Sequence, residues 1–447
     1  MSRLLLTFYG DDFTGSTDAL EQLTRFGIRT ALFIEPPTPE QLRRFPGLQA
    51  IGVAGMTRSM KPAALRRTLF SALKRLKALG ARHVHYKVCS TFDSSPETGS
   101  IGAALDVAAR VFDGPFVPML VGAPALGRYC LFGNLFARFG IGTDGDIHRL
   151  DRHPSVSRHP VTPMTESDLR RHLARQTRKK IALFDILKVA LPESERRAVL
   201  KRILADKPDV VLFDALFPED LQRVGALIDA HGRAGRPLFS VGSSAIEAAL
   251  GGLWRERNVP PGAASLPAGP TDQILVGSGS RSPVTERQIA LALKRGFAEV
   301  ALDPSALATK AKSDEEIKRA TDLSVGFLRR RRSVIVHTTG RASGRPASAH
   351  FRGGMASVLG ASLGRVLRGA QAQSPVRRLC IAGGDTSGHV ARALGIQTLE
   401  MIAPLTPGAP LSRAFAPASP VDGCEIVFKG GQVGAENYFE SVQRGRI

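Results

Sequence analysis

A pair of adjacent carboxylates, Asp11 and Asp12, ends the first apolar run of the chain, residues 4–9. A helical pattern over residues 14–26 follows, so the pair is predicted to lie at a turn between a strand and a helix. In an open α/β sheet, ligands bind at such turns, outside the carboxyl ends of the strands. Two carboxylates there could bind substrate hydroxyls or a metal, or accept a proton. An Asx turn that caps the helix explains the same residues equally well.

Basic and hydroxyl side chains stand at the ends of later strand-like runs in the first half of the chain. They are Arg58, Lys87, Ser90, Thr91 and Arg128. Because the carboxyl ends of parallel strands share one edge of a sheet, these side chains are predicted to line one crevice with the two aspartates. Acidic groups for hydroxyls and cations for a carboxylate would suit a small polyhydroxy acid. Taken singly, each cation is better explained as a surface or capping group.

Three glycine-rich loops follow strand-like runs in the second half, at residues 277–282, 383–388 and 430–434. Glycine, serine and a helix N-terminus let backbone N–H groups and hydroxyls approach a phosphate. One such loop is weak evidence, because glycine turns are common, but three in one domain predict a nucleotide-binding site. None of the three is a Walker motif or a clean Gly-x-Gly-x-x-Gly.

Strand-like runs alternate with amphipathic helical patterns along both halves, which predicts an α/β fold with largely parallel sheets flanked by helices. The alternation stops in a stretch rich in Pro, Gly and Ala. We therefore predict an N-terminal domain over residues 1–253, a linker over 254–272 and a C-terminal domain over 273–447. Residues 148–166, which contain three prolines, are predicted to form an extended loop.

The composition excludes several classes of protein. An apolar content of 43% with 23% charged residues is that of a globular protein. No apolar run approaches the roughly 20 residues of a membrane helix, and no signal peptide is apparent. The four cysteines form no Cys-x-x-Cys pair, so we expect no zinc site and no disulfide framework, and a cytoplasmic location fits.

The formal net charge of +21 is the one compositional anomaly, since it would attract polyanions. The cations are spread along the whole chain, and the densest cluster, residues 329–332, is predicted to close a helix, where cations complement the helix dipole. A single Trp and four Tyr offer few stacking platforms for a nucleic acid. The charge is therefore interpreted as a solvated surface that favours small anionic substrates.

The order of these motifs resembles that of the four-carbon acid sugar kinase family. The matching segments are residues 10–15, 123–128, 241–244, 276–280 with Thr285 and Gln288, 383–387 and 429–431. The resemblance spans nearly the whole chain. It implies two α/β domains, of which the first binds an acid sugar and the second binds ATP, with phosphorylation of a substrate hydroxyl in the cleft between them.

The resemblance also implies roles for individual residues. ATP contacts would fall on Ser278, Ser280, Gly383, Gly384, Asp385, Thr386, Gly430 and Gly431. Asp11 or Asp12 would accept the hydroxyl proton, and Arg58 or Lys87 would hold the substrate carboxylate. Mg²⁺ would bridge the phosphates, with Asp385 as an indirect ligand. No metal site formed by the protein alone is predicted.

Residues 87–94 depart from the Lys-Ile-Asp-Ser-Thr-Leu-Arg-Gly of many family members. The implied acceptor is a tetronate, a 3-oxo-tetronate or a relative, and this departure makes a branched acid sugar such as 3-oxo-isoapionate the alternative. A polyanion-binding protein without kinase activity is a remote alternative, based on the charge, and an inactive scaffold is disfavoured by the intact glycine loops. No membrane and no specific nucleic acid is expected as a partner, and a homo-oligomer is left open.

Overall fold

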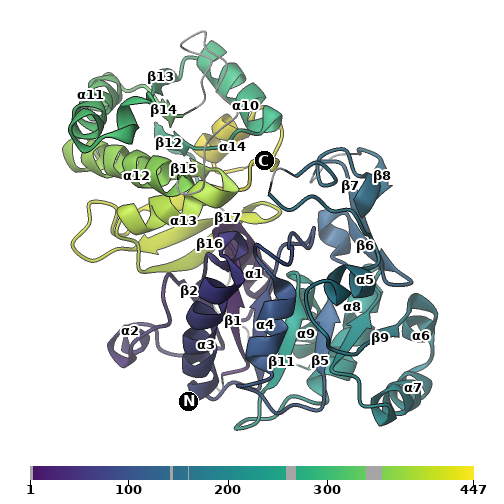
Figure 1. The fold of residues 1–447 in the computed structure, drawn as a ribbon. Coiled ribbons are helices and arrows are strands. Elements are labelled where there is room, and N and C mark those ends of the chain that lie inside the picture. Colours follow the sequence, from purple (N-terminus) through teal and green to yellow (C-terminus); the bar gives the residue numbers. More distant parts are fainter. Residues whose placement is uncertain (1–3, 141–143, 160, 258–267, 339–354, 447) are drawn as a thin grey trace. The chain divides into compact units, whose positions relative to one another are not determined.

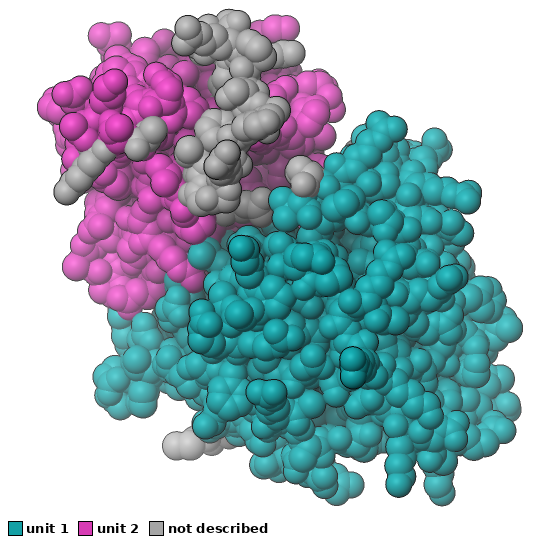
Figure 2. Space-filling model, viewed as in Figure 1, with its two compact units in different colours: residues 1–264 teal, residues 265–447 magenta. Residues whose placement is uncertain are grey.

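The computed structural model describes residues 4–140, 144–159, 161–257, 268–338 and 355–446. The chain divides into two compact units, residues 1–264 and 265–447 (Figure 2). In each unit a mostly parallel sheet is flanked by helices, so the predicted α/β fold class is confirmed (Figure 1). The predicted cleft between the domains stays a prediction.

Unit 1 is built on a parallel sheet with the strand order β2-β3-β1-β4-β11-β5-β10-β9. Its strands are β1 (Leu6–Gly10), β2 (Thr30–Phe33), β3 (Ala50–Ala54), β4 (His83–Lys87), β5 (Val117–Leu120), β9 (Ile181–Phe184), β10 (Val210–Phe213) and β11 (Leu238–Gly242). Every residue of β1, β3 and β4 is buried. Helices on both faces exclude water from these strands, which is why β1 and β3 are mostly apolar in sequence, whereas β4 carries the buried polar residues His83, His85 and Lys87.

Two rows of helices cover this sheet (Figure 1). In one row α1 (Phe13–Arg25) packs on α9 (Ala245–Glu256), and α9 packs on α8 (Pro218–Asp229). In the other, α3 (Pro62–Ala78) packs on α4 (Ile101–Ala108). The remaining helices of the unit are α2 (Pro39–Arg43), α5 (Leu169–Ala174), α6 (Ile186–Ala190) and α7 (Glu193–Ala205).

Unit 2 has the strand order β13-β14-β12-β15-β18-β17-β16. The strands are β12 (Ile274–Ser278), β13 (Ala298–Ala301), β14 (Val334–His337), β15 (Arg378–Ala382), β16 (Thr398–Thr406), β17 (Ala409–Phe415) and β18 (Glu425–Lys429). The helices are α10 (Pro283–Lys294), α11 (Lys310–Arg329), α12 (Met355–Gln373), α13 (Gly384–Ala393) and α14 (Tyr438–Arg444). The helices α11, α12 and α13 pack side by side, and α10 packs on α14.

Several elements differ from the sequence-based prediction. The strand β2 and an antiparallel sheet of β6 (Arg128–Leu131), β7 (Asn134–Arg138) and β8 (Ile147–Arg149) were not predicted. The start of the predicted loop 148–166 belongs to β8 and a short 3₁₀ turn, Leu150–Arg152. The hairpin of β16 and β17, which was also not predicted, adds antiparallel pairing to the largely parallel sheet of unit 2. The helix α9 runs to Glu256, into the range predicted as linker.

None of the helices in the described ranges is both long and apolar enough to cross a membrane.

The basic cluster at residues 329–332 lies at the end of a helix, as predicted, because α11 ends at Arg329 and β14 begins at Val334.

Candidate active site

Three neighbouring strands of unit 1 bring the predicted acidic and basic residues together. The last residue of β1, Gly10, is in register with Ala54 of β3 and with Lys87 of β4. The backbone N–H of Asp11 donates to the Lys87 carbonyl at 2.8 Å, and the N–H of Arg58 donates to the Asp11 carbonyl at 2.9 Å. The turn after β1 is thus held by the chain on both sides, and the prediction that these strand ends meet is confirmed for Asp11, Asp12, Arg58 and Lys87.

Asp12 is the N-cap of α1. Its Oδ1 accepts from the Gly15 N–H at 3.0 Å, and its Oδ2 accepts from Thr14 Oγ1 at 2.8 Å. Arg58 Nη1 lies 2.9 Å from the same Oδ2. Burial alone would raise the pKa of Asp12, but Arg58, Lys87 and these hydrogen bonds lower it below its usual value. Asp12 is therefore an ionised cap, as the structural interpretation of the pair predicted.

Asp11 is in a different environment, although it is the adjacent residue. Its side chain is buried, and within the described residues its Oδ1 has no hydrogen-bond partner. Burial, with the charge of Asp12 beside it, raises the pKa of Asp11 to about 8. Asp11 can therefore gain and lose a proton near neutral pH.

Lys87 extends beneath the turn that follows β1. It is buried, and its Nζ lies 3.9 Å from Asp18 Oδ2 on α1. A Cβ atom on Gly15 would lie 2.4 Å from this Nζ and 2.3 Å from Asp12 Oδ1, so only glycine leaves room for the amine here. Burial would lower the pKa of Lys87, but Asp18 and Asp12 raise it overall, so the amine is charged.

A group of buried titratable residues lies behind Lys87, and sequence reasoning missed it. Glu247 of α9 is fully buried, and neither of its carboxylate oxygens has a hydrogen-bond partner in the part of the chain described. Burial raises the pKa of Glu247 to about 8 and lowers that of His85 to about 3. The 3.7 Å contact between them is therefore one of a protonated acid with a neutral imidazole, not an ion pair. The only signal in the sequence is a glutamate within an apolar segment.

The loop after β4 contributes hydroxyl and acidic groups. Thr91 Oγ1 donates to Asp93 Oδ1 at 2.9 Å and lies 3.0 Å from Cys89 Sγ. Ser90 is buried in the same loop. Burial raises the pKa of Cys89 to about 12, so this side chain is an uncharged thiol. Asp93 is a residue of this loop that the predicted set did not include.

Arg128 reaches the same neighbourhood from β6, with most of its hydrogen bonds directed to the backbone. Its Nη1 donates to the carbonyls of Leu126, Gly127 and Arg138 at 3.1–3.2 Å. Burial lowers the pKa of Arg128, and Cys89 and Asp93 act on it electrostatically. Its Nε is buried without a partner in the described structure. Arg128 therefore links the turn between η2 (Pro124–Leu126) and β6 to Arg138 at the end of β7.

In unit 2 the three glycine loops also begin in register. Ser278, Ala382 and Lys429, the last residues of β12, β15 and β18, are aligned across the sheet. The N–H of Gly279 donates to the Ala382 carbonyl, and the N–H of Gly383 donates to the Lys429 carbonyl, both at 3.0 Å. The loops are therefore brought to one edge of one sheet.

The first two loops are in close contact around Thr386. A Cβ atom on Gly279 would lie 2.6 Å from Thr386 Cγ2, and one on Gly383 would lie 2.5 Å from Thr386 Oγ1. Gly383 has φ +137°, a conformation that L-residues rarely adopt, and α13 begins directly after it at Gly384. The side chain of Asp385 lies outside the described part of the structure.

Two hydroxyls in these loops are buried without partners. Ser278 Oγ and Thr386 Oγ1 have no hydrogen bond to any described residue. Buried polar groups are nearly always hydrogen-bonded, so these two require a ligand or water. Ser280 Oγ accepts from the Ser282 N–H at 3.2 Å, and a Cβ atom on Gly431 would lie 2.7 Å from it. At Gly430 the nearest atom to such a Cβ is 3.5 Å away.

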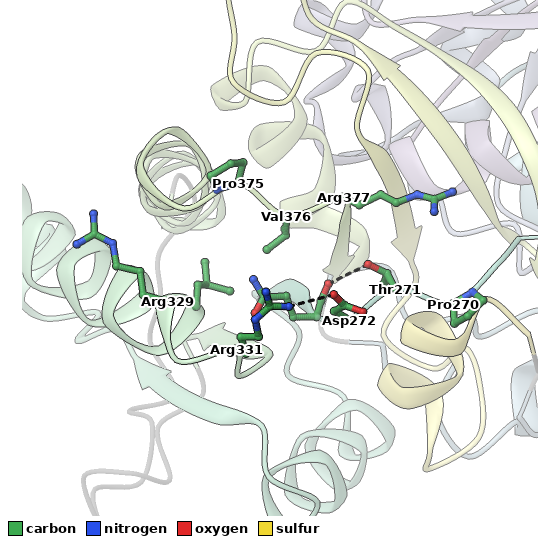
Figure 3. A pocket seen from close by; sticks show the side chains of 10 residues that line it. Pro270, Thr271, Asp272, Arg329, Arg331, Pro375, Val376 and Arg377 are labelled. Carbon is green, nitrogen blue, oxygen red and sulfur yellow. Dashed lines mark hydrogen bonds and ion pairs between the residues drawn. The ribbon is translucent and has the colours of Figure 1, made fainter.

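A separate cavity of about 530 Å³ lies at the opposite end of the strands of unit 2 (Figure 3). It is lined by residues that precede β12 and β15 or end α11, among them Asp272, Arg331 and Val376. Arg331 Nη1 lies 3.3 Å from Asp272 Oδ2, and both side chains are largely exposed. None of the predicted site residues lines this cavity, so it is not the candidate active site.

Comparison with known proteins also divides the chain into an N-terminal and a C-terminal part. Residues 6–250 match the model of a sugar-binding N-terminal domain, and residues 275–439 match that of a nucleotide-binding C-terminal domain. The chain is 44% identical to 3-oxo-isoapionate kinase of Paraburkholderia graminis, with 99% of this chain and 95% of the relative covered. It is 30% identical to 3-oxo-tetronate kinase of Burkholderia multivorans, with 99% and 97% covered.

Solved structures show the same fold. A protein of Salmonella typhimurium LT2 superposes with a TM-score of 0.75 at 25% identity, covering 99% of both chains. A Haemophilus influenzae protein superposes with a TM-score of 0.70 at 21% identity, covering 98% of this chain and 99% of the other. With the two domain matches and the whole-length relatives, these findings confirm the resemblance found in the motifs: the chain belongs to the four-carbon acid sugar kinase family.

Proposed function

We propose that the chain, a sugar-acid kinase, uses ATP to phosphorylate a hydroxyl of a 3-oxo acid sugar, with 3-oxo-isoapionate as the first candidate acceptor. The observation that carries the proposal is the 44% identity to 3-oxo-isoapionate kinase over 99% of this chain. The second candidate acceptor is 3-oxo-tetronate, since relatives of that name reach 30–31% identity, also over 99% of this chain. The unusual loop 87–94 supports the branched acceptor over the linear one.

Asp11 is the proposed acceptor of the substrate hydroxyl proton. A general base works best when its pKa lies near the pH of the reaction, and the pKa of Asp11 is raised to about 8. Its Oδ1 has no hydrogen-bond partner among the described residues, so its capacity to accept a hydrogen bond is not used by another group there. Asp12 is unsuited to this role, because Thr14, Gly15 and Arg58 occupy its oxygens.

The substrate carboxylate is assigned to Arg58 and Lys87. Both cations lie at the same strand ends as Asp11, and the charge of Lys87 is maintained by Asp18 and Asp12. Ser90, Thr91 and Arg128 complete the proposed sugar side, where Thr91 and Asp93 offer groups to hydroxyls. A carboxylate and several hydroxyls are the features of an acid sugar that such a set would recognise.

The phosphates of ATP are assigned to the three glycine loops of unit 2. Ser278 and Thr386 supply buried hydroxyls that need a partner, and Gly279 and Gly383 leave space that side chains would fill. The N–H groups at the start of α13, which no described side chain caps, add a favourable site for negative charge. Ser280, Gly384, Gly430 and Gly431 are the remaining residues of the proposed cradle.

Phosphoryl transfer of this kind uses Mg²⁺, which neutralises charge on the phosphates when bound. A cradle of hydroxyls and backbone N–H groups fits phosphates carrying their own Mg²⁺ rather than a metal held by the protein alone. The role of Asp385 as an indirect ligand stays a prediction. A cytoplasmic location and a homo-oligomeric state also stay predictions.

A panel of acceptors tests the proposal. The purified chain would be assayed with Mg²⁺ and ATP in a coupled ADP assay on 3-oxo-isoapionate, 3-oxo-tetronate and the corresponding non-oxidised tetronates. We expect the highest kcat/KM on 3-oxo-isoapionate and at least about tenfold lower values on the non-oxidised acids, because an unpaired polar group in the site costs about 1–3 kcal/mol. Acceptor-dependent ADP formation with none of these acids would overturn the proposal.

A further inference from the structure

Lys429 is a buried cation at the end of β18, directly before the third glycine loop. Its side chain is fully buried, and its Nζ donates to Thr285 Oγ1 of α10 at 3.0 Å. The same Nζ lies 5.4 Å from the centroid of the Tyr438 ring. The described side chains place no carboxylate in an ion pair with it. A buried lysine without a counter-charge is costly, so its presence needs an explanation.

Thr285 links Lys429 to the third glycine loop by hydrogen bonds. Its hydroxyl has one proton, which it donates to the Gly431 carbonyl at 2.7 Å, so it accepts from Lys429. One helical turn further along the same face of α10, Gln288 Nε2 donates to the carbonyls of Val433, Gly434 and Ala435 at 2.9–3.1 Å. Two side chains of α10 thus hold the loop 430–435.

This loop in turn lies against the first glycine loop. A Cβ atom on Gly431 would lie 2.7 Å from Ser280 Oγ and 3.0 Å from Ser282 Cβ. The contacts from Lys429 through Thr285 to Gly431 therefore set the position of one proposed phosphate loop relative to another.

The groups that face Lys429 leave its charge uncompensated. Cys380 of β15 acts on it electrostatically, but burial raises the pKa of that thiol to about 12, so it is neutral. Tyr438 of α14 presents its ring, and Thr285 of α10 presents a hydroxyl. Burial lowers the pKa of Lys429 to about 8. An anion bound at the adjacent loops would favour the protonated amine.

We infer that Lys429 is a positioning residue for the polyphosphate of the nucleotide: through Thr285 it fixes the loop that begins at Gly430, and it supplies a buried positive charge behind the three glycine loops. The inference rests on the proposed nucleotide site. It adds to that site a residue that does not itself touch the nucleotide.

Binding of ATP without acceptor tests the inference, with calorimetry on the full chain in the presence of Mg²⁺. Thr285→Val removes the link, whereas Thr285→Ser keeps the hydroxyl. Thr321→Val is the matched control, because Thr321 is a buried threonine of α11 whose hydroxyl donates within its own helix, to the Ile317 carbonyl at 2.7 Å. We expect Thr285→Val to weaken ATP binding about tenfold, and Thr285→Ser and Thr321→Val to stay within about twofold of wild type.

Lys429→Met tests the charge. Wild-type affinity for ATP should fall as the pH rises from 7 to 9, because the amine loses its proton in that range, and the variant should bind at least about tenfold more weakly with a flatter pH dependence. Unchanged ATP affinity in folded Thr285→Val, or an equal loss in Thr285→Ser, would overturn the inference. The Thr285 pair decides the matter even if Lys429→Met fails to fold. A chain that binds ATP in this way but phosphorylates no acid sugar would contradict the proposed function and leave this inference standing.

Discussion

At the scale of single residues, two adjacent aspartates have opposite chemistry because their neighbours differ. Asp12 is ionised by Arg58 and by the first turn of α1, whereas burial raises the pKa of Asp11 to about 8. The sequence pattern predicted the pair and its position but left open which carboxylate accepts the proton. That choice depends on which carboxylate oxygens already have hydrogen-bond or ion-pair partners. The partner of Asp12 from outside its own turn, Arg58, follows β3 rather than β1, so the sequence pattern around the pair does not reveal it.

Asp11→Asn should lower kcat roughly 10²- to 10⁴-fold, the usual contribution of a general base, with a KM for ATP close to wild type. Steady-state kinetics with saturating acceptor would measure it. Asp12→Asn is the comparison, because asparagine is also a good N-cap. It loses the ion pair to Arg58 and the negative charge that acts on Asp11 and Lys87, so we expect a loss of kcat smaller than that of Asp11→Asn. A kcat in Asp11→Asn within threefold of wild type would rule out its role as base.

The pH dependence of the reaction should report Asp11. The residue accepts a proton only when ionised, so log kcat/KM for the acceptor should rise with pH and level off above about 8. The rise should be absent from the residual activity of Asp11→Asn. A wild-type profile that is flat between pH 6 and 9 would contradict the assignment.

At the scale of elements, α9 and α1 enclose the buried acids behind Lys87. Glu247 keeps its proton in the folded chain up to about pH 8, whereas the unfolded chain loses it near the ordinary value of 4.5. Between these values the folded state binds more protons than the unfolded state, so this residue lowers the free energy of unfolding as the pH rises.

Glu247→Gln removes this penalty, because an amide does not ionise. The difference in Tm between variant and wild type should therefore shift in favour of the variant as the pH rises from 5 to 8, and thermal unfolding at several pH values would measure it. A Tm difference that is independent of pH would show that Glu247 ionises normally in the fold.

The turn before α13 offers a second test at this scale. Gly383→Ala introduces a Cβ 2.5 Å from Thr386 Oγ1 at a residue with φ +137°, so the loop must move and the KM for ATP should rise at least about tenfold. Gly296→Ala is the matched control, because Gly296 also has a positive φ, +95°, with no atom within 4 Å of the added Cβ. Equal kinetic effects of the two substitutions would assign the loss to general strain.

The elements that could be predicted from the sequence are those that position the site. Buried parallel strands such as β1 and β12 give continuous apolar runs, and the polar or glycine-rich residues after them mark the strand ends. Among the missed elements, β2 is a buried strand of only four residues. The strand β6 is only alternately buried. The helix α9 is buried on nearly all sides, so a polar residue in its sequence is no sign of an exposed face, and the burial of Glu247 could not be predicted from the pattern.

At the scale of the whole molecule, the family match covers both halves of the chain and explains why two different kinds of strand-end loop occur in one sequence. The acidic and basic residues belong to the sugar-binding half, and the glycine loops belong to the nucleotide-binding half. The net charge of +21 is then consistent with a surface that attracts two anionic substrates, an acid sugar and ATP. Because the chain belongs to a kinase family over its whole length, the alternative of a polyanion-binding protein without enzymatic activity is rejected.

The central claim is that the chain transfers phosphate from ATP to a hydroxyl of a 3-oxo acid sugar, and the product itself tests it most directly. Phosphorus NMR of a reaction containing the chain, Mg²⁺, ATP and 3-oxo-isoapionate should show a new phosphomonoester signal that grows in step with ADP. The signal should be absent when Asp11→Asn replaces the wild type over the same time. ADP accompanied only by inorganic phosphate, or no turnover with either 3-oxo acid, would contradict the account.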